Sequence, residues 1–265
     1  FTIDEALELR NAKIKNEIII FSKLQKNNIE LAYKENIILN LSSFDDVEHI
    51  ESFYLKNKVS PKYHLKFDTG MTRLGFDLND AEAVYESLSK PLHPYIEGIY
   101  THFATADEGN LSYAKKQLSD FKMVVRKVES FGLKFKFIHC SNSGAVLQLE
   151  KSYFNMVRVG MLLYGALPSN EVIDNIGIKP VMSFCGSIVN VRKVKKNTPV
   201  SYGGVYKTAS DTNIAVIQTG FADGFPRPWF ESGYVIYNGE KFKIAGRVCM
   251  DQLMIDLGDV VPELG

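Results

Sequence analysis

The sequence predicts an α/β protein: a TIM-like (β/α) barrel, incomplete on its N-terminal side, followed by a mostly β domain. Hydrophobic runs alternate with helical patterns over the first two thirds of the chain, and four of these runs end in polar or charged side chains that a barrel interior could not bury. These side chains are Lys66 and Asp68, His102, Asn142 and Ser143, and Arg158. After Pro180 the pattern changes to short strand-like runs separated by turn residues.

The expected elements of the barrel follow one another along the chain. They are a helix at 4–12, capped by Thr2 or Asp4; strands at 17–22 and 37–42; a helix at 44–57; a strand at 63–68; a helix at 79–89; a strand at 96–103; a helix at 112–131; a strand at 135–141; a helix at 144–149; and a strand at 156–165. The longest helix is indicated by apolar residues with helical spacing and is ended by a glycine. These residues are Phe121, Val124, Val125, Val128 and Gly132.

Six strands are fewer than the eight that close a barrel of this type. An open sheet would leave two unpaired edges, which folds avoid. The chain also begins with a helix that no strand precedes. We therefore expect about two further strands before Phe1, and a cofactor-binding barrel domain at residues 1–178 that lacks them.

Residues 179–265 are expected to form the β domain, incomplete at its C-terminal end. Strand-like runs lie at 182–194, 213–221, 233–248 and 252–259. The segment Tyr237-Asn238-Gly239-Glu240 predicts a β-hairpin with a two-residue turn. No helical pattern follows Pro180, so this part is predicted to be all-β.

Composition excludes several classes of protein. The formal net charge is +0, with 31 basic and 31 acidic residues, which argues against nucleic acid as a partner. No apolar stretch is long enough to span a membrane. The three cysteines are far apart and odd in number, which favours a reducing compartment and a cytoplasmic location. The five histidines form no metal-binding motif, so no metal site is expected.

Two polar strand ends suggest an anion site. Asn142-Ser143-Gly144 lies where a strand gives way to a helix, and free backbone N–H groups at a helix start can bind an anion. Gly160 and Met161, after Arg158, offer similar donors at the next strand end. The alternative is that Asn142 and Ser143 merely cap the helix. Arg158 itself needs a partner in its apolar run, and an ion pair with Asp68 is the structural alternative to a functional contact.

Other candidates stand on strand ends or glycine turns. His102 is either a catalytic group or a hydrogen-bonded core residue. Lys66, Asp68 and Arg73 surround a glycine turn, for which a salt-bridged loop is the alternative. In the β domain, Tyr202 lies beside a glycine turn, and ordered loops are expected at 220–226 and 246–251.

Taken together, these segments resemble the alanine racemases, pyridoxal-phosphate enzymes of fold type III. The matching segments are 66–75 (KFDTGMTRLG), 101–108 (THFATADE), 140–144 (CSNSG), 157–165 (VRVGMLLYG), 200–203 (VSYG), 220–224 (GFADG) and 246–252 (GRVCMDQ). They occur in the family's order over nearly the whole chain. The resemblance implies a barrel that binds pyridoxal 5'-phosphate, a β domain, and a head-to-tail homodimer in which each site is completed by the partner's β domain.

The resemblance also assigns residues around the cofactor. It implies that the phosphate is held by four residues: Asn142, Ser143, Gly160 and Met161. Arg158 would face the pyridine nitrogen, and Arg73 would contact the phenolic oxygen of the cofactor and the carboxylate of a small amino-acid substrate. Lys66 matches a lysine that is carbamylated in many members.

Catalysis in this family uses two bases on opposite faces of the substrate. The resemblance implies that Tyr202 is one base, with His102 lowering its pKa through a hydrogen-bond chain that includes Arg158. Met250 and Asp251 would contact the substrate carboxylate from the partner chain. The other base is the lysine that binds the cofactor, which we expect in the sequence before Phe1. Phe221 departs from the tyrosine of many members and leaves the preferred amino acid open.

The expected function is alanine racemase, an isomerase that supplies D-alanine for peptidoglycan. The alternatives within the same chemistry are a racemase of serine or lysine, or one of broad specificity. A non-catalytic pyridoxal-phosphate-binding protein would lack the β domain, and a related basic-amino-acid decarboxylase would place an acidic residue where Arg158 stands. A protein with no cofactor would leave every polar strand end unexplained.

Overall fold

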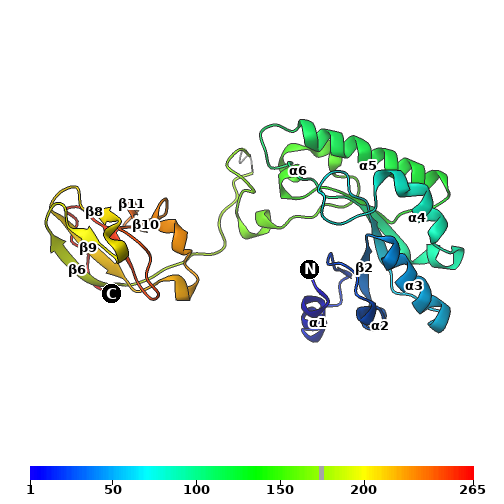
Figure 1. The fold of residues 1–265 in the computed structure, drawn as a ribbon, viewed down its shortest axis with the longest axis horizontal. Helices are drawn as coiled ribbons and strands as arrows, with labels where there is room; N and C mark the ends of the chain where they lie inside the picture. Colours follow the sequence, from blue (N-terminus) through cyan, green and yellow to red (C-terminus); the bar gives the residue numbers. More distant parts are fainter. Residues whose placement is uncertain (173–175) are drawn as a thin grey trace. The chain divides into compact units, whose positions relative to one another are not determined.

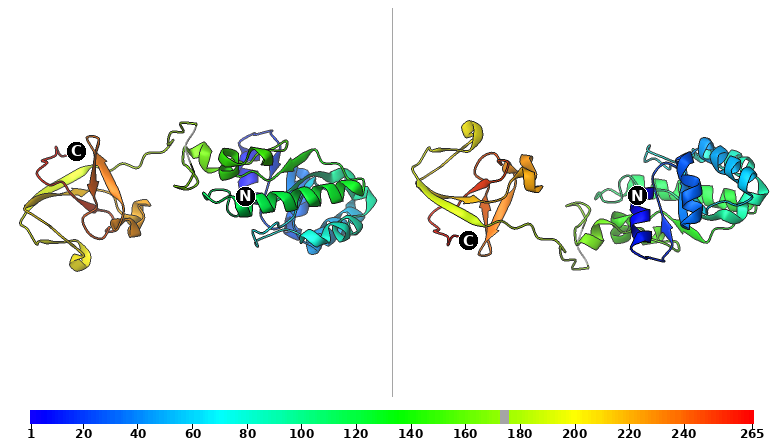
Figure 2. Two further views of the ribbon diagram at one scale, coloured as in Figure 1. Left: turned by 90° about the horizontal axis from the view of Figure 1, so that it is seen from above. Right: turned by 90° about the horizontal axis from the view of Figure 1, so that it is seen from below.

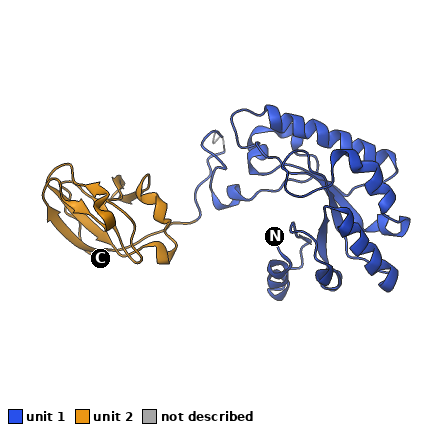
Figure 3. Cartoon of the chain, in the orientation of Figure 1, with its two compact units in different colours: residues 1–181 blue, residues 182–265 orange. Residues whose placement is uncertain are grey.

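The computed structural model describes residues 1–172 and 176–265. The chain divides into two compact units, Phe1–Val181 and Met182–Gly265 (Figure 3). The first unit contains a parallel sheet with helices, and the second unit consists mainly of antiparallel strands (Figure 1, Figure 2).

The first unit is built on a five-stranded parallel sheet whose strands follow one another in sequence order. The strands are β1 (Ile18–Ile19), β2 (Ile37–Leu41), β3 (Tyr63–Lys66), β4 (Ile96–Tyr100) and β5 (Phe137–His139). The helices are α1 (Ile3–Asn11), α2 (Ile29–Lys34), α3 (Phe44–Asn57), α4 (Ala81–Ser87), α5 (Ser112–Ser130) and α6 (Ser143–Gln148). This sequential βα order confirms the predicted barrel architecture, and only α2 had no counterpart among the expected helices.

Helix limits follow local chemistry. Thr2 caps α1 by accepting from the Glu5 N–H, and the Glu5 carboxylate accepts from the Thr2 N–H, which completes a capping box. Gly132, at φ +99°, ends α5 in the left-handed region as predicted. The helix expected from residue 79 begins two residues later, because a 3₁₀ turn at Leu78–Asp80 comes first.

The sixth predicted strand, at 156–165, is wrong. Its pairing with β5 is limited to a bridge between Met156 and His139 and a bond from the Arg158 N–H to the Ser141 carbonyl at 2.9 Å. Before this bridge, the side chain of Asn155 bonds to the backbone: its Oδ1 accepts from the Ile138 N–H at 2.8 Å, and its Nδ2 donates to the Lys136 carbonyl at 2.9 Å. After it, the 3₁₀ turn at Met161–Tyr164 ends the extended conformation.

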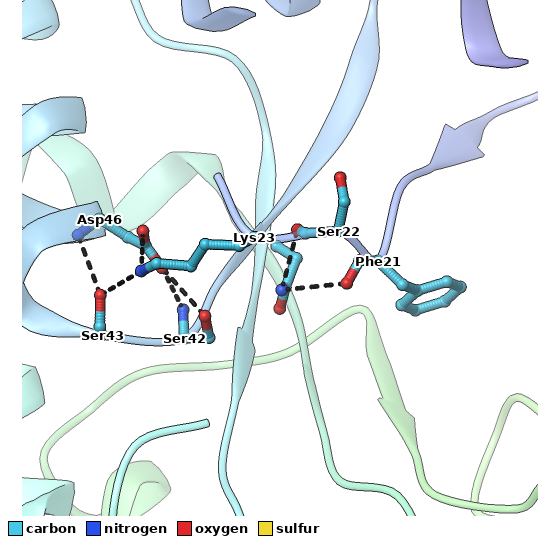
Figure 4. A network of polar contacts seen from close by, with 7 residues as sticks. Phe21, Ser22, Lys23, Ser42, Ser43 and Asp46 are labelled. Carbon is cyan, nitrogen blue, oxygen red and sulfur yellow. Dashed lines mark hydrogen bonds and ion pairs between the residues drawn. The ribbon is translucent and has the colours of Figure 1, made fainter. Parts of the chain in front are cut away.

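A polar network joins the segment after β1 and the end of β2 to the start of α3 (Figure 4). Ser43 caps α3, and its Oγ also accepts a bond from the Lys23 ammonium. Buried Asp46 forms an ion pair with Lys23 and accepts from the backbone N–H of Ser42 at 2.8 Å and from its hydroxyl at 3.1 Å. Asn40 donates to the carbonyls of the segment that follows β1.

The second unit is antiparallel. The strands β6 (Ile188–Val194), β9 (Thr212–Ile217) and β12 (Leu253–Asp256) form one sheet in the order β12-β9-β6. The strands β10 (Tyr234–Tyr237) and β11 (Glu240–Lys243) form the predicted hairpin, with Asn238 and Gly239 both at positive φ. A small pair, β7 (Pro199–Val200) and β8 (Tyr206–Lys207), was not expected.

Within the described ranges, no helix combines the length and the apolar character needed to cross a bilayer. The same ranges contain no group of three or more His, Cys, Asp or Glu side chains placed to hold a metal ion.

Candidate active site

A hollow of about 360 Å³ lies in the first unit beside residues that follow strands β3, β4 and β5. It is lined by Met71, His102, Phe103, Ala104, Asp107, Asn142, Ser143, Gly144, Arg158, Gly160, Met161 and Pro168. Six of the residues proposed from the sequence therefore share one concave surface. Lys66 and Arg73 do not line this hollow, and Tyr202, Met250 and Asp251 belong to the second unit.

The start of α6 is one wall of the hollow. Asn142 caps this helix by accepting from the Ala145 N–H at 3.0 Å. The Ser143 hydroxyl accepts from the Gly160 N–H at 3.0 Å and so joins the two predicted anion-binding segments. A Cβ on Gly144 would lie 2.5 Å from the Ala106 carbonyl oxygen, so only glycine permits this approach.

Arg158 is held by neutral acceptors alone. Its Nη2 donates to the Thr101 carbonyl at 2.8 Å and lies 3.2 Å from Nδ1 of His102, while Nη1 lies 2.5 Å from Nδ1 of His139. Its guanidinium also lies over the ring of Tyr100, 5.2 Å from the centroid. Burial lowers its pKa to about 10, and the group remains a cation at neutral pH.

The ion pair between Arg158 and Asp68 that we considered is wrong. Among the described residues, no carboxylate lies within ion-pair distance of Arg158, and Asp68 binds its own loop instead. Its Oδ1 accepts from the N–H groups of Gly70 and Met71 at 2.8 and 2.7 Å, and Oδ2 accepts from the Arg73 N–H at 3.1 Å. The alternative of a salt-bridged loop is wrong for the same reason: backbone hydrogen bonds shape this turn.

Lys66 is the last residue of β3 and is 4% exposed. Its ammonium lies 5.6 Å from the centroid of the Tyr100 ring, and no ion pair to it occurs in the described part of the chain. Burial and then the charge of Arg73 lower its pKa to about 8. A lysine in this setting is neutral in part near neutral pH and can therefore act as a nucleophile.

The turn that carries Arg73 depends on Gly75, which has φ +135°. A Cβ there would lie 2.5 Å from the Asp68 backbone nitrogen. We expect Gly75→Ala to lower the free energy of unfolding by about 2 to 3 kcal/mol, because the strained φ and the clash act together. Gly132→Ala is the matched control: it has positive φ but open space, and should cost about 1 kcal/mol. Urea denaturation of both variants measures the difference, and equal losses would contradict the steric argument.

His102 faces the hollow and is neutral. Burial, and then the charge of Arg158, lower its pKa to about 4. Since Arg158 donates to its Nδ1, the proton of the neutral ring is on Nε2, which has no hydrogen-bond partner within residues 1–172 and 176–265. Both interpretations of His102, as a catalytic group and as a hydrogen-bonded core residue, are compatible with this position.

We expect acid to lower the stability of the protein, because two buried histidines, His64 and His102, are neutral in the folded chain. The pKa values of His64 and His102 fall from 6.5 in the unfolded chain to about 4 in the folded one, so between these values the unfolded chain binds more protons. Their contribution to stability is complete above pH 6.5 and is lost as the pH falls towards 4, with a slope of about 1.4 kcal/mol per pH unit for each proton. Urea unfolding at several pH values should show this, with a shallower slope in His102→Gln; an unchanged slope in that variant would contradict the assignment.

In the second unit, Tyr202 is 65% exposed and follows Ser201, which has φ +62°. Met250 and Asp251 lie on an exposed loop whose backbone is held by the 220–224 loop: the Phe221 N–H donates to the Cys249 carbonyl and the Ala222 N–H to that of Met250. The Ser201 hydroxyl donates to the Arg247 carbonyl at 2.6 Å. The three proposed residues of this unit therefore lie on loops that are tied together.

Tyr100, His139 and Phe21 all contact Arg158, and none of them is among the site residues predicted from the sequence. The local pattern around Tyr100 and His139 indicates only that both lie in strands. The available signal was their position as the last residues of β4 and β5, at the level where polar strand ends were expected.

Comparison with known proteins identifies the family. The model of the alanine racemase N-terminal domain matches residues 1–168, and that of the C-terminal domain matches residues 181–265. An alanine racemase of Desulforamulus reducens is 36% identical over 260 residues, covering 97% of this chain and 70% of that protein. One from Methanococcus maripaludis is 36% identical over 272 residues, covering 98% and 72%.

Solved structures give the same result. The alanine racemase of a D-cycloserine-producing Streptomyces lavendulae superposes with a TM-score of 0.87 at 31% identity, covering 99% of this chain and 70% of the other. The structure of the alanine racemase of Bacillus anthracis with bound L-Ala-P gives a TM-score of 0.83 at 35% identity. This match covers 99% of this chain and 68% of the other. The match spans both units and includes the hollow around Arg158, and the chain belongs to the alanine racemase family.

Proposed function

We propose that this protein is an alanine racemase that interconverts L- and D-alanine with pyridoxal 5'-phosphate by a two-base mechanism. The observation that carries the proposal is the hollow in which a fixed cation, Arg158, faces the start of α6. Family membership over both units supports the same reaction class, an isomerase. When bound, the cofactor supplies an electron-withdrawing ring that acidifies the substrate α-proton.

The residues present fit this cofactor. The start of α6 and Met161 offer backbone N–H groups, because the first N–H groups of a helix have no partner within it; the Gly160 N–H beside them donates to the Ser143 hydroxyl. We propose that Asn142, Ser143, Gly160 and Met161 hold the phosphate there. Arg158 uses only its Nη atoms in hydrogen bonds among the described residues, which leaves the Nε–H to face a ring-nitrogen acceptor.

Arg158 also favours racemisation over a decarboxylase with an acidic residue at this place. Its pKa stays near 10 despite burial, so it donates a hydrogen bond without releasing a proton to the ring. The ring is then a weaker electron sink, which limits side reactions during a reversible proton exchange.

We propose that Tyr202 takes and returns the proton on one face of the substrate. His102 supports it: with Nδ1 bound to Arg158, its Nε2–H can stabilise a phenolate oxygen. Arg73 would contact the substrate carboxylate from the loop held by Asp68, and Met250 and Asp251 would contact it from the second unit.

The remaining assignments are also proposals. We propose a homodimer in which the β domain of one chain, residues 179–265, completes the site on the barrel, residues 1–178, of its partner. The exposure of Tyr202 and Met250 supports a partner surface. We further propose a cytoplasmic enzyme that supplies D-alanine for peptidoglycan, and carbamylation of Lys66, whose lowered pKa of about 8 favours reaction with carbon dioxide.

A substrate panel tests the proposed function. The enzyme, expressed from its complete reading frame and supplied with pyridoxal 5'-phosphate, is assayed with L-alanine, L-serine and L-lysine at equal concentrations. We expect alanine to be racemised fastest. Faster turnover of serine or lysine would replace the narrow assignment with one of the alternatives, to which Phe221 would contribute by lacking a hydroxyl. Cofactor binding without turnover of any substrate would indicate a non-catalytic binding protein.

A further inference from the structure

Besides its contact with His102, Arg158 belongs to a second series of hydrogen-bonded side chains. Its Nη1 lies 2.5 Å from Nδ1 of His139, and Nε2 of His139 lies 2.8 Å from Nδ1 of His64. His139 is the last residue of β5, and His64 lies in β3, with β4 between these two strands. Both rings are almost completely buried.

The donor and acceptor roles in these contacts determine which ring nitrogens carry a proton. Arg158 can only donate, so Nδ1 of His139 must be unprotonated and accept. A neutral His139 then carries its proton on Nε2 and donates it to Nδ1 of His64. The proton of a neutral His64 is in turn on Nε2. That atom is buried and has no hydrogen-bond partner among the described residues, so only the contact with His139 sets this tautomer.

Electrostatics keep both rings neutral. Burial and then the charge of Arg158 lower the pKa of His64 to about 4; Lys136 acts in the same direction and Glu17 opposes them. Burial, Arg158 and the neighbouring His64 also lower the pKa of His139 far below its ordinary value. Near neutral pH each of the two rings therefore has one protonated nitrogen, which can donate a hydrogen bond, and one unprotonated nitrogen, which can accept one.

Packing prevents the rings from rotating. The His139 ring stacks on Tyr100 at 4.8 Å between centroids and an interplanar angle of 7°. His64 fills the space above Gly98, where an added Cβ would lie 2.7 Å from the imidazole. A side chain at position 98 of β4 would displace the His64 ring, so the glycine leaves the space that this ring occupies.

We propose that His139 and His64 are positioning residues, which fix the guanidinium of Arg158 and, through it, the tautomer of His102. With Nη1 held by His139, Arg158 cannot turn, and Nη2 stays directed at Nδ1 of His102. The Nε2–H of His102 is then always available on the side of the hollow. This inference deepens the proposed function, since it rests on Arg158 and His102 acting in that site.

The first test needs no variant. Nitrogen NMR of the full chain labelled with ¹⁵N-histidine distinguishes protonated from bare ring nitrogens. At neutral pH we expect His64, His102 and His139 each to carry a single proton on Nε2. A protonated Nδ1 on His139, or a mixture of tautomers on His102, would overturn the proposal.

Variants then separate positioning from packing. In His139→Leu we expect His102 to show both tautomers, whereas His139→Asn, which keeps an acceptor near the place of Nδ1, should retain one tautomer. Phe137→Leu is the control, since it removes a ring beside His64 but no hydrogen bond. Unchanged His102 signals in His139→Leu would overturn the inference. If the tautomers were as expected and alanine were not racemised, the proposed function would fail and this arrangement would stand.

Discussion

Replacing Tyr202 by phenylalanine should slow racemisation of alanine by about 10² to 10⁴-fold, the usual contribution of a positioned acid or base. The variant keeps the ring but loses the only group on this side chain that can take or return a proton. Binding of pyridoxal 5'-phosphate should change little, because the proposed phosphate and ring contacts come from the first unit. Turnover measured in both directions, together with cofactor fluorescence, checks both statements.

Exchange of the α-proton of alanine for deuterium in D₂O tests the role of Tyr202 as one of two bases more directly. Loss of one of two bases should impair exchange more for one enantiomer than for the other, because each base serves one face. Tyr234→Phe is a matched control: Tyr234 is also an exposed tyrosine of the second unit, and its hydroxyl has no hydrogen bond among the described residues. Full activity in Tyr202→Phe would remove this residue from the mechanism and leave the function to be explained by other groups.

Replacing Asp46 by alanine should lower the free energy of unfolding by about 3 to 5 kcal/mol. Asp46 is fully buried and accepts two hydrogen bonds from Ser42, whose backbone N–H would lose its partner. Lys23 would also lose its carboxylate, although it is partly exposed and can turn to water. Far-ultraviolet circular dichroism during urea unfolding measures the effect, because the α-helices of the described residues all lie in the first unit.

Asp45→Ala is the matched control for this experiment. It removes a carboxylate from the adjacent, exposed position of the same helix and should change stability by no more than about 0.5 kcal/mol. Trp229, the single tryptophan, lies in the second unit, so its fluorescence follows that part of the chain separately. An Asp46→Ala loss no larger than that of the control would mean that the network in Figure 4 contributes little.

Local patterns in the sequence were sufficient for the order of elements and for the family. Helix α3 was predicted with its observed limits, and the Asn238-Gly239 turn produced the expected hairpin, since both depend on neighbouring residues. The predicted strand at 156–165 was wrong because only its first residues pair with the end of β5 and a 3₁₀ turn begins at Met161. The length over which an apolar run pairs depends on which segments meet in space and has no local signature.

The sequence by itself determined the alternation of strands and helices, the change to an all-β second part, and the polar strand ends that include His102, Ser143 and Arg158. Only the tertiary structure decided the partners of those groups: Arg158 binds neutral acceptors rather than Asp68, namely the rings of His102 and His139 and the carbonyls of Thr101 and Cys140. The physical reason is that strand ends are specified by hydrophobic period over a few residues. The hydrogen-bond geometry and burial of a charged group depend instead on side chains brought together from distant parts of the chain.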